Sequence, residues 1–270
     1  MSRIEETFQR LRVRGEKAFI PYLTAGDPDL RWTGRFIKAL AGGGADLIEI
    51  GVPFSDPIAD GPTIQKASQR ALRSGATLGK VIRLVGEIRA EVSTPLVLMG
   101  YYNPIFKMGV EVFARESSRS GVDGLIVPDL PPEEAAPLIS ACREWGIDTI
   151  FLVAPTTPLE RLQQVAEVAR GFLYYVSLTG VTGAREQLAA GIREAVAGIR
   201  TQTSLPIAVG FGISTPDQAR LVSQWADGVV VGSALVDLID KTNDKEELEV
   251  SLSSFALSFK QALQDPPSPL

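Results

Sequence analysis

Two of the three carboxylates in the segment from Ile48 to Gly61, which reads IEIGVPFSDPIADG, stand where they could do chemistry. Glu49 lies inside an apolar run, Ala45 to Val52, that has the composition of a buried strand, and Asp60 ends the Pro- and Gly-rich loop that follows. A charge inside a core strand costs several kcal/mol unless something compensates it. The chain has no histidine, so proton transfer near neutral pH is left to carboxylates, Tyr, Lys or Cys. We predict that Glu49 is the acid–base group.

Composition narrows the range of partners. The 270 residues include 27 Lys and Arg against 32 Asp and Glu, a formal charge of −5, and no basic cluster is evident, so we expect no nucleic-acid partner. No apolar run approaches the ~20 residues of a membrane span, and residues 1–14 lack the apolar core of a signal peptide. We therefore expect a cytoplasmic protein that does not bind a membrane.

Cysteine and histidine content bears on metal binding. Cys142 is the only cysteine, which excludes an internal disulfide and a cysteine-based zinc site, and its helical spacing predicts a buried core thiol. With no histidine either, we predict no metal site.

Short apolar runs recur eight times, and a segment with helical features follows each. The predicted strands are Ala18–Thr24, Leu47–Val52, Leu96–Gly100, Gly124–Pro128, Asp148–Val153, Phe172–Ser177, Pro206–Gly210 and Gly228–Gly232. Most lack polar alternation, which is typical of parallel strands covered on both faces. Eight such units predict a single α/β domain, a (β/α)8 TIM barrel over residues 1–264, with a disordered tail at 265–270. A doubly wound sheet is the alternative, but the segment after the first strand, TAGDP, is not the glycine fingerprint usual there.

Helix signals between the runs share one form. Asp27-Pro28, Thr157-Pro158 and Thr215-Pro216 each pair an N-cap residue with proline at the first helical position, and the segment PPEE at 131–134 is expected to open another helix. An extra helix at Ile4–Val13 is expected to close the bottom of the barrel. A short extra helix is expected after the last strand, from Ser233 to about Ile239.

Active sites of such barrels lie where strands lead into helices. Of the polar residues at these places, Asp129 is expected to make a cap or loop hydrogen bond. Glycine loops follow the last two strands, where barrels often bind phosphate through backbone N–H groups, so Gly212, Gly232 and Ser233 are the predicted phosphate site. The segment LTGVTG at 178–183 is either a lid that excludes water or a plain loop.

The remaining residues restrict the chemistry. No lysine lies in the last turn of a strand, so a Schiff base is not expected, and redox chemistry lacks its glycine fingerprint. What remains is acid–base chemistry by carboxylates on a phosphorylated substrate whose own structure absorbs the electrons.

Several motifs together resemble one family. The segment at 48–61 is similar to the signature of the tryptophan synthase alpha subunit, and other motifs of that family follow in order at 21–28, 101–106, 127–131, 179–183, 210–214 and 232–233. The resemblance extends from residue 4 to residue 263. It implies a lyase of tryptophan biosynthesis that cleaves indole-3-glycerol phosphate to indole and glyceraldehyde 3-phosphate, with the indole ring as electron sink.

The resemblance also implies roles for individual residues. Glu49 would protonate indole C3 and shuttle protons, and Asp60 would accept a hydrogen bond from the indole N–H. The apolar slot would be lined by Tyr22, Tyr101, Tyr174 and Phe211, and Tyr22 stands where many relatives carry Phe. Thr182 would hold Asp60 when the lid closes, and the phosphate would be held by N–H groups of Gly183, Gly212, Gly232 and Ser233.

A partner follows from the resemblance as well. The family works as an alpha2beta2 tetramer in which the beta subunit uses pyridoxal phosphate, while the alpha subunit itself needs no cofactor. The loop Pro53–Pro57, with Asp56, and the loop at Asn103-Pro104 would face the beta subunit. The other interpretation is that these are ordinary proline-stiffened loops.

Three rival functions stay open on sequence alone. Another phosphate-binding barrel, such as an isomerase, would leave Asp60 without a role. A lyase that releases indole without a beta partner is closer. A non-catalytic barrel that binds a phosphorylated ligand is disfavoured by the presence of both Glu49 and Asp60.

Overall fold

Eight parallel strands close into a barrel in the computed structural model, which describes residues 1–176, 185–210 and 212–264. The strands are β1 (Ala18–Thr24), β2 (Ile48–Gly51), β3 (Leu96–Met99), β4 (Gly124–Ile126), β5 (Asp148–Val153), β6 (Leu173–Val176), β7 (Ile207–Gly210) and β8 (Gly228–Val231). Each pairs with its neighbour in sequence, and β8 pairs with β1. The predicted (β/α)8 barrel is confirmed. Tail residues 265–270 lie outside the described residues.

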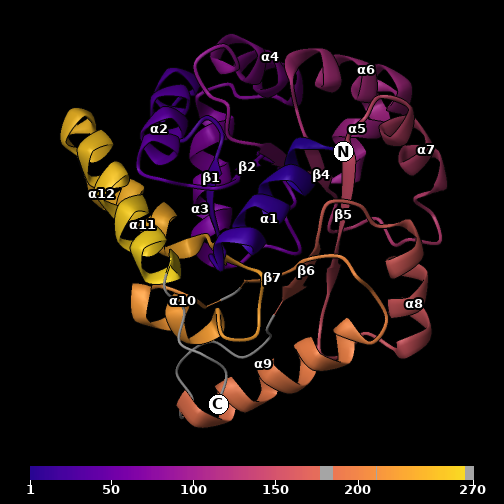
Figure 1. Ribbon diagram of the computed structural model, residues 1–270. Coiled ribbons are helices and arrows are strands. Elements are labelled where there is room, and N and C mark those ends of the chain that lie inside the picture. Colours follow the sequence, from indigo (N-terminus) through magenta and orange to yellow (C-terminus); the bar gives the residue numbers. More distant parts are fainter. Residues whose placement is uncertain (177–184, 211, 265–270) are drawn as a thin grey trace.

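Helices surround the barrel as an outer layer (Figure 1). They are α1 (Arg3–Arg14), α2 (Leu30–Gly42), α3 (Pro62–Arg73), α4 (Leu78–Ile88), α5 (Tyr102–Met108), α6 (Val110–Ser120), α7 (Ala136–Glu144), α8 (Leu159–Val168), α9 (Arg185–Arg200), α10 (Pro216–Val222), α11 (Ser233–Lys241) and α12 (Lys245–Gln264). The largest buried cluster joins the outer faces of the strands to these helices and includes Cys142. Both faces of the strands are therefore covered, which explains their continuous apolar sequences.

The helix α1 closes the end of the barrel where the strands begin. Ser2 forms a capping box with Glu5, and Ile4 and Phe8 pack into the interior cluster of the barrel. Arg3 adds an ion pair to Asp123, directly before β4, at 2.9 Å. Figure 1 shows α1 crossing the middle of the ring of strands. The predicted N-terminal plug is confirmed, so only the opposite end can hold an open site.

Three of the predicted helix starts are wrong. The N-cap of α2 is Asp29, whose side chain accepts a hydrogen bond from Trp32 N. The carboxylate of Asp27 instead accepts hydrogen bonds from Arg70. α8 begins one residue later than predicted, because the Thr157 hydroxyl accepts from Ala154 N instead of capping the helix. The segment PPEE at 131–134 forms a turn, and α7 begins only at Ala136.

The other two predictions of helix starts are confirmed. Thr215 caps α10 in a capping box with Gln218, with proline at the first helical position. The short helix after the last strand is α11, which runs to Lys241.

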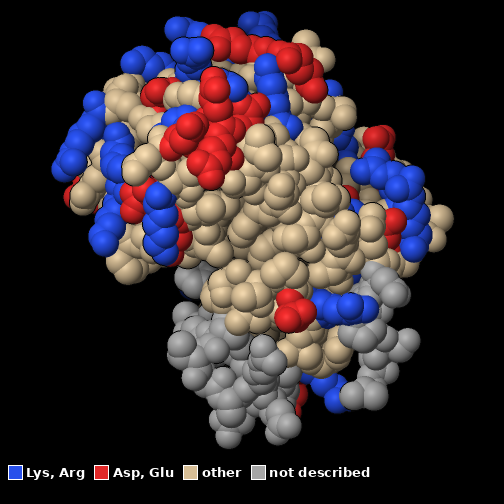
Figure 2. All heavy atoms as spheres, turned by 90° about the vertical axis from the view of Figure 1, so that its left-hand side faces the viewer, with Lys and Arg blue, Asp and Glu red and all other residues tan. Residues whose placement is uncertain are grey.

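The face of the molecule that carries α12 and α2 shows no strong segregation of charge (Figure 2). On the face that includes α12 and α2, basic and acidic side chains are interspersed around a broad uncharged area (Figure 2). Among the described residues, no helix is both long and apolar enough to cross a bilayer.

Candidate active site

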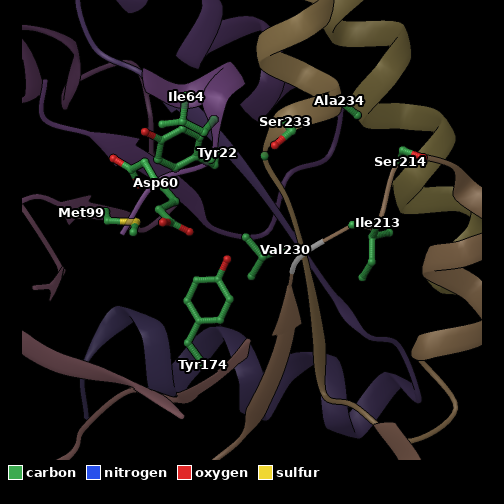
Figure 3. A pocket seen from close by; sticks show the side chains of 14 residues that line it. Tyr22, Asp60, Ile64, Met99, Tyr174, Ile213, Ser214, Val230, Ser233 and Ala234 are labelled. Carbon is green, nitrogen blue, oxygen red and sulfur yellow. The ribbon is translucent and has the colours of Figure 1, made fainter. Parts of the chain in front are cut away.

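A cavity of about 160 Å³ opens at the end of the barrel opposite α1. Its lining comes from strand ends and from the loops and helices that follow them: Tyr22, Glu49, Asp60, Gly61, Ile64, Met99, Tyr174, Gly212, Ile213, Ser214, Val230, Gly232, Ser233 and Ala234. Figure 3 shows Asp60, Tyr22 and Tyr174 on one side of this space and Ser233, Ala234 and Ser214 on the other. The structure thus brings the predicted carboxylates and the predicted phosphate site to a single cavity.

Glu49 is held in the wall of the barrel. It lies on β2, paired in register with Tyr22 of β1 and Val97 of β3, and is 1% exposed. Its Oε2 is buried without a hydrogen-bond partner among the described residues. Burial, and secondly the negative charge of Asp60, raise the pKa of Glu49 to about 8. The group therefore holds its proton at neutral pH, as a general acid must.

Asp60 lies at the end of the loop before α3. Burial raises the pKa of Asp60 to about 6, while interaction with the Tyr101 hydroxyl lowers it. That hydroxyl also accepts a hydrogen bond from Ala59 N at 2.9 Å, which fixes the loop beside it. Asp60 is thus mostly ionised at pH 7 while Glu49 is mostly protonated. Two carboxyl groups with separated pKa values can divide the roles of acid and anionic stabiliser.

Two tyrosines form the aromatic part of the cavity wall. Burial raises the pKa of both Tyr22 and Tyr174, so both hydroxyls stay neutral. The Tyr22 hydroxyl lies 3.3 Å from Thr24 Oγ1. A Cβ on Gly51 would overlap the Tyr22 hydroxyl, and one on Gly210 would lie 2.5 Å from the Tyr174 hydroxyl. The two glycines therefore make room for the rings, a role that the sequence alone did not indicate.

The start of α11 forms the opposite wall. Gly232 precedes the helix, Ser233 begins it and Ala234 follows, all lining the cavity. The first N–H groups of a helix have no partner within the helix and point toward its N-terminal end, where they favour an anion. Gly212 adds a backbone with φ of 77°, a conformation suited to glycine. The wall has the character of a phosphate site.

Some lining residues were missed by sequence reasoning. Met99 and Val230 point inward from strands, which only the register of the closed barrel reveals. Ile64 lies on the first turn of α3, and Gly61, Ile213, Ser214 and Ala234 flank residues already predicted. Three predicted residues, Thr182, Gly183 and Phe211, lie outside the described residues, as does the predicted lid at 178–183.

The residues predicted to face a partner lie apart from the cavity. Asp56 and Asn103 are exposed, Pro57 and Pro104 are half-buried, and Pro53 is buried. Two large apolar side chains beside them are strongly exposed, Ile58 at 84% and Phe106 at 67%.

Tyr101, predicted to line the apolar slot, is not among the described residues that line the cavity, although its hydroxyl interacts with Asp60. Phe54, in the loop at 53–57, packs against this ring. It stacks on Tyr101, with ring centroids 5.0 Å apart and planes inclined by 25°. Asp129, predicted to make a cap or loop bond, accepts a hydrogen bond from Tyr102 N at the start of α5 (2.9 Å).

Metal ligands do not gather at this site. Across the part of the chain that the structure describes, no group of three or more His, Cys, Asp or Glu side chains is placed to hold a metal ion.

A closed (β/α)8 barrel with a buried and a half-buried carboxylate at one cavity has the architecture of an enzyme that works by acid–base chemistry. Comparison with known proteins specifies it further. The model of the tryptophan synthase alpha chain family matches residues 8–264. The tryptophan synthase alpha chain of Geobacter sp. (strain M21) is 52% identical over 263 residues, which cover 97% of this chain and 98% of that protein. That of Rippkaea orientalis is 47% identical over 266 residues, 98% and 99% of the two chains.

Solved structures agree with these sequences. The crystal structure of tryptophan synthase subunit alpha from Legionella pneumophila str. Paris superimposes with a TM-score of 0.90 at 38% identity, over 97% of this chain and 98% of that one. A Mycobacterium tuberculosis tryptophan synthase structure gives 0.89 at 38% identity, over 98% and 99%.

The chain belongs to the tryptophan synthase alpha chain family. Membership confirms the predicted lyase activity, the cleavage of indole-3-glycerol phosphate to indole for the beta subunit.

Proposed function

We propose that the cavity holds indole-3-glycerol phosphate between the two carboxylates and the start of α11, with Glu49 as the proton donor. The observation that best supports this role is the buried Oε2 of Glu49, which faces the cavity without a hydrogen-bond partner among the described residues. A buried carboxyl group in this state is costly to the fold, and a reacting substrate would supply the missing partner.

The proposed reaction begins with protonation. Glu49 gives its proton to C3 of the indole ring, and the ring nitrogen becomes positively charged as its lone pair enters the ring system. The Asp60 carboxylate accepts a hydrogen bond from the ring N–H and stabilises this charge. Both groups are in the required form between about pH 6 and about pH 8.

Bond cleavage then restores the enzyme. The Glu49 carboxylate takes the proton of the hydroxyl on the carbon attached to C3. The carbon–carbon bond breaks, that carbon becomes the aldehyde of glyceraldehyde 3-phosphate, and the bonding electrons return to the ring as neutral indole. Glu49 ends protonated, as it began, so no cofactor is needed in this chain.

Binding is divided between the two walls. Tyr22 and Tyr174, with Ile64 and Met99, would contact the indole ring and the propyl chain through apolar surface. Backbone N–H groups of Gly212, Gly232 and Ser233 would hold the phosphate. Tyr101 would orient Asp60. For Thr182, Gly183 and Phe211 the roles implied by the resemblance stay predictions.

The partner surface is proposed from exposure and position. The loop at 53–57 and the start of α5, with Asp56, Pro57, Asn103 and Pro104, would contact the beta subunit, which carries the pyridoxal phosphate. The exposed Ile58 and Phe106 support this by position, because both flank the proposed loops and a partner bound there would bury them. Pro53 would shape the loop from beneath. We also propose that residues 1–264 are one catalytic domain, and a cytoplasmic location stays a prediction.

Glu49→Gln tests the proposal. Indole release should fall by about 10²–10⁴-fold, because the amide has the shape of the acid but no acidic proton to transfer. Glu87→Gln is a matched control, since Glu87 is exposed on α4 away from the cavity. Turnover within twofold of wild type in a folded Glu49→Gln protein would exclude Glu49 from the reaction.

A further inference from the structure

Arg70 joins three elements that surround the cavity. From α3 its Nε and Nη2 donate to the two oxygens of Asp27, in the loop after β1, at 2.8 Å and 2.7 Å. Its Nη1 pairs with Asp240 of α11 at 2.9 Å. One guanidinium thus connects the loop after β1 with α3 and α11.

The bond to Asp27 is the stronger of the two. The side chain of Asp27 is 4% exposed, and a buried carboxylate needs a charged partner. A planar guanidinium binds both carboxylate oxygens at once, which fixes its orientation as well as its position. Asp240 is 48% exposed, so its pair with Arg70 contributes little to stability by itself. The Asp240 pair instead restricts the position of α11, because Asp27 already fixes the guanidinium to which Asp240 binds.

The two helices joined by Arg70 carry the two ends of the site. α3 begins at Pro62, two residues after Asp60, and α11 begins at Ser233 in the wall proposed to bind phosphate. Near the cavity these helices already touch, because Ile64, Ala67 and Val236 form one cluster around Tyr22. Figure 3 shows Ile64 on α3 above Tyr22, with Ser233 and Ala234 at the start of α11 beside it.

Apolar packing near one end of the helices restricts their crossing angle only to within about 15–20°, and a directional ion pair further along restricts it more. Arg70 lies about 9 Å further along α3 than Ile64, at ~1.5 Å per helical residue. Two fixed points along a helix define its direction, whereas one does not. The Arg70 pairs are therefore placed to set the angle between α3 and α11.

We propose that Arg70 is a positioning residue that fixes the separation between Asp60 and the phosphate-binding start of α11. The inference rests on the proposed function, because it requires that the substrate be held at both of these points. A substrate held at both ends reacts only when the two ends are correctly spaced, and a misplacement of about 1 Å can cost ~10²-fold in rate. Phosphate affinity should not depend on Arg70, because the N–H groups that bind phosphate stay in place on α11.

The test separates turnover from phosphate binding in the complex with the beta subunit. Arg70→Lys keeps a positive charge beside the buried Asp27 but cannot bind both carboxylates in a fixed geometry. We expect kcat for indole release to fall by about 10–100-fold, with the inhibition constant of inorganic phosphate within about twofold of wild type. Arg73→Lys, an exposed position on the same helix, is the control and should change neither value.

Asp240→Asn decides the matter if Arg70→Lys fails to fold. Asp240 is half-exposed, so this variant should keep its melting temperature, yet it loosens α11 and should lower kcat severalfold. Wild-type kcat in folded Asp240→Asn protein would overturn the proposal, and so would a loss of phosphate affinity in place of kcat. Failure of the proposed function itself would look different, because the wild-type complex would then show no inhibition by phosphate.

Discussion

Glu49 and Asp60 face the same cavity, and the negative charge of Asp60 adds to the effect of burial in raising the pKa of Glu49. The relationship is unequal, because Asp60 sits nearer solvent beside the Tyr101 hydroxyl and has the lower pKa of the two. Burial, and secondly the ionised Asp60, therefore keep Glu49 protonated. In a chain without histidine, this arrangement provides an acid at neutral pH.

The raised pKa of Glu49 has a consequence for stability. The pKa of Glu49 is about 8 in the folded protein against an ordinary value of 4.5, so between these two pH values the folded protein binds the proton more tightly than the unfolded chain does. The contribution of the protonated Glu49 to the free energy of unfolding is therefore fully present below about pH 4.5 and is lost as the pH rises through about 8. Glu49→Gln should raise the free energy of unfolding by about 1–3 kcal/mol at pH 8 and by much less at pH 4.5.

Urea unfolding at the two pH values measures this difference. Glu87→Gln, at an exposed site, should show no such pH dependence. If Glu49→Gln lowers the free energy of unfolding at pH 8, burial of the Glu49 carboxyl group does not destabilise the folded protein.

Gly51 should not accept a side chain without movement of Tyr22, whose hydroxyl and ring carbons fill the space beside it. Gly51→Ala places a methyl group where the Tyr22 hydroxyl lies, so the ring must move into the cavity. We expect a raised KM and a loss of stability of about 1–3 kcal/mol. Tyr22→Phe in the same chain should restore part of the lost stability and part of the KM, because it removes the nearest of the Tyr22 atoms that the methyl group meets, although two ring carbons still lie within 3 Å of it.

Gly42→Ala is the control for this pair, since a Cβ at Gly42 has no neighbour within 4 Å among the described residues. If the double variant is no better than Gly51→Ala alone, contact with the hydroxyl is not the cause of the defect.

Substitutions at the start of α11 should separate backbone from side-chain binding of phosphate. Gly232→Val should raise KM severely: its Cβ would sit 3.6 Å from Tyr22 without strain, but its methyl groups would enter the space proposed for phosphate. Ser233→Ala keeps the N–H group, and its effect should be mild, about 1 kcal/mol or less in kcat/KM. Steady-state kinetics on both variants is the measurement, and equal effects would argue against a backbone phosphate site.

Binding of the beta subunit should speed indole release through Phe54. Phe54 stacks on Tyr101, whose hydroxyl holds the loop beside Asp60, so ordering the loop at 53–57 raises the fraction of molecules with Asp60 in place. The isolated chain should be slow, and Phe54→Ala should bind the beta subunit but lose most of a stimulation that we expect to be about 10-fold or more.

Titration of indole release with beta subunit, beside a separate binding assay, measures this coupling. Leu257→Ala, half-exposed on α12, should behave as wild type. Equal stimulation of Phe54→Ala and wild type would show that the stacking carries no coupling, and a flat wild-type titration despite complex formation would favour a lyase that works alone.

The sequence predicted the barrel because its strands are apolar on both faces, and it predicted Glu49 because a carboxylate stands out in such a strand. It did not predict where α2 begins. Asp27 is a good capping residue by local rules, but its carboxylate binds the guanidinium of Arg70, 43 positions away. Met99 and Val230 were missed for a related reason, because only closure of the barrel determines which strand residues point inward. Local chemistry could be read from the chain, whereas contacts distant in sequence could not.

The central claim is that Glu49 stays protonated at neutral pH, and carboxyl-carbon NMR of protein labelled at glutamate tests it most directly. The spectrum of wild type is compared with that of Glu49→Gln to assign the signal, and the signal is followed from pH 4 to pH 10. We predict one glutamate carboxyl group that titrates with a pKa of about 8 and is absent from Glu49→Gln. A spectrum in which every glutamate has titrated by about pH 5, as ordinary glutamates do, would contradict the account.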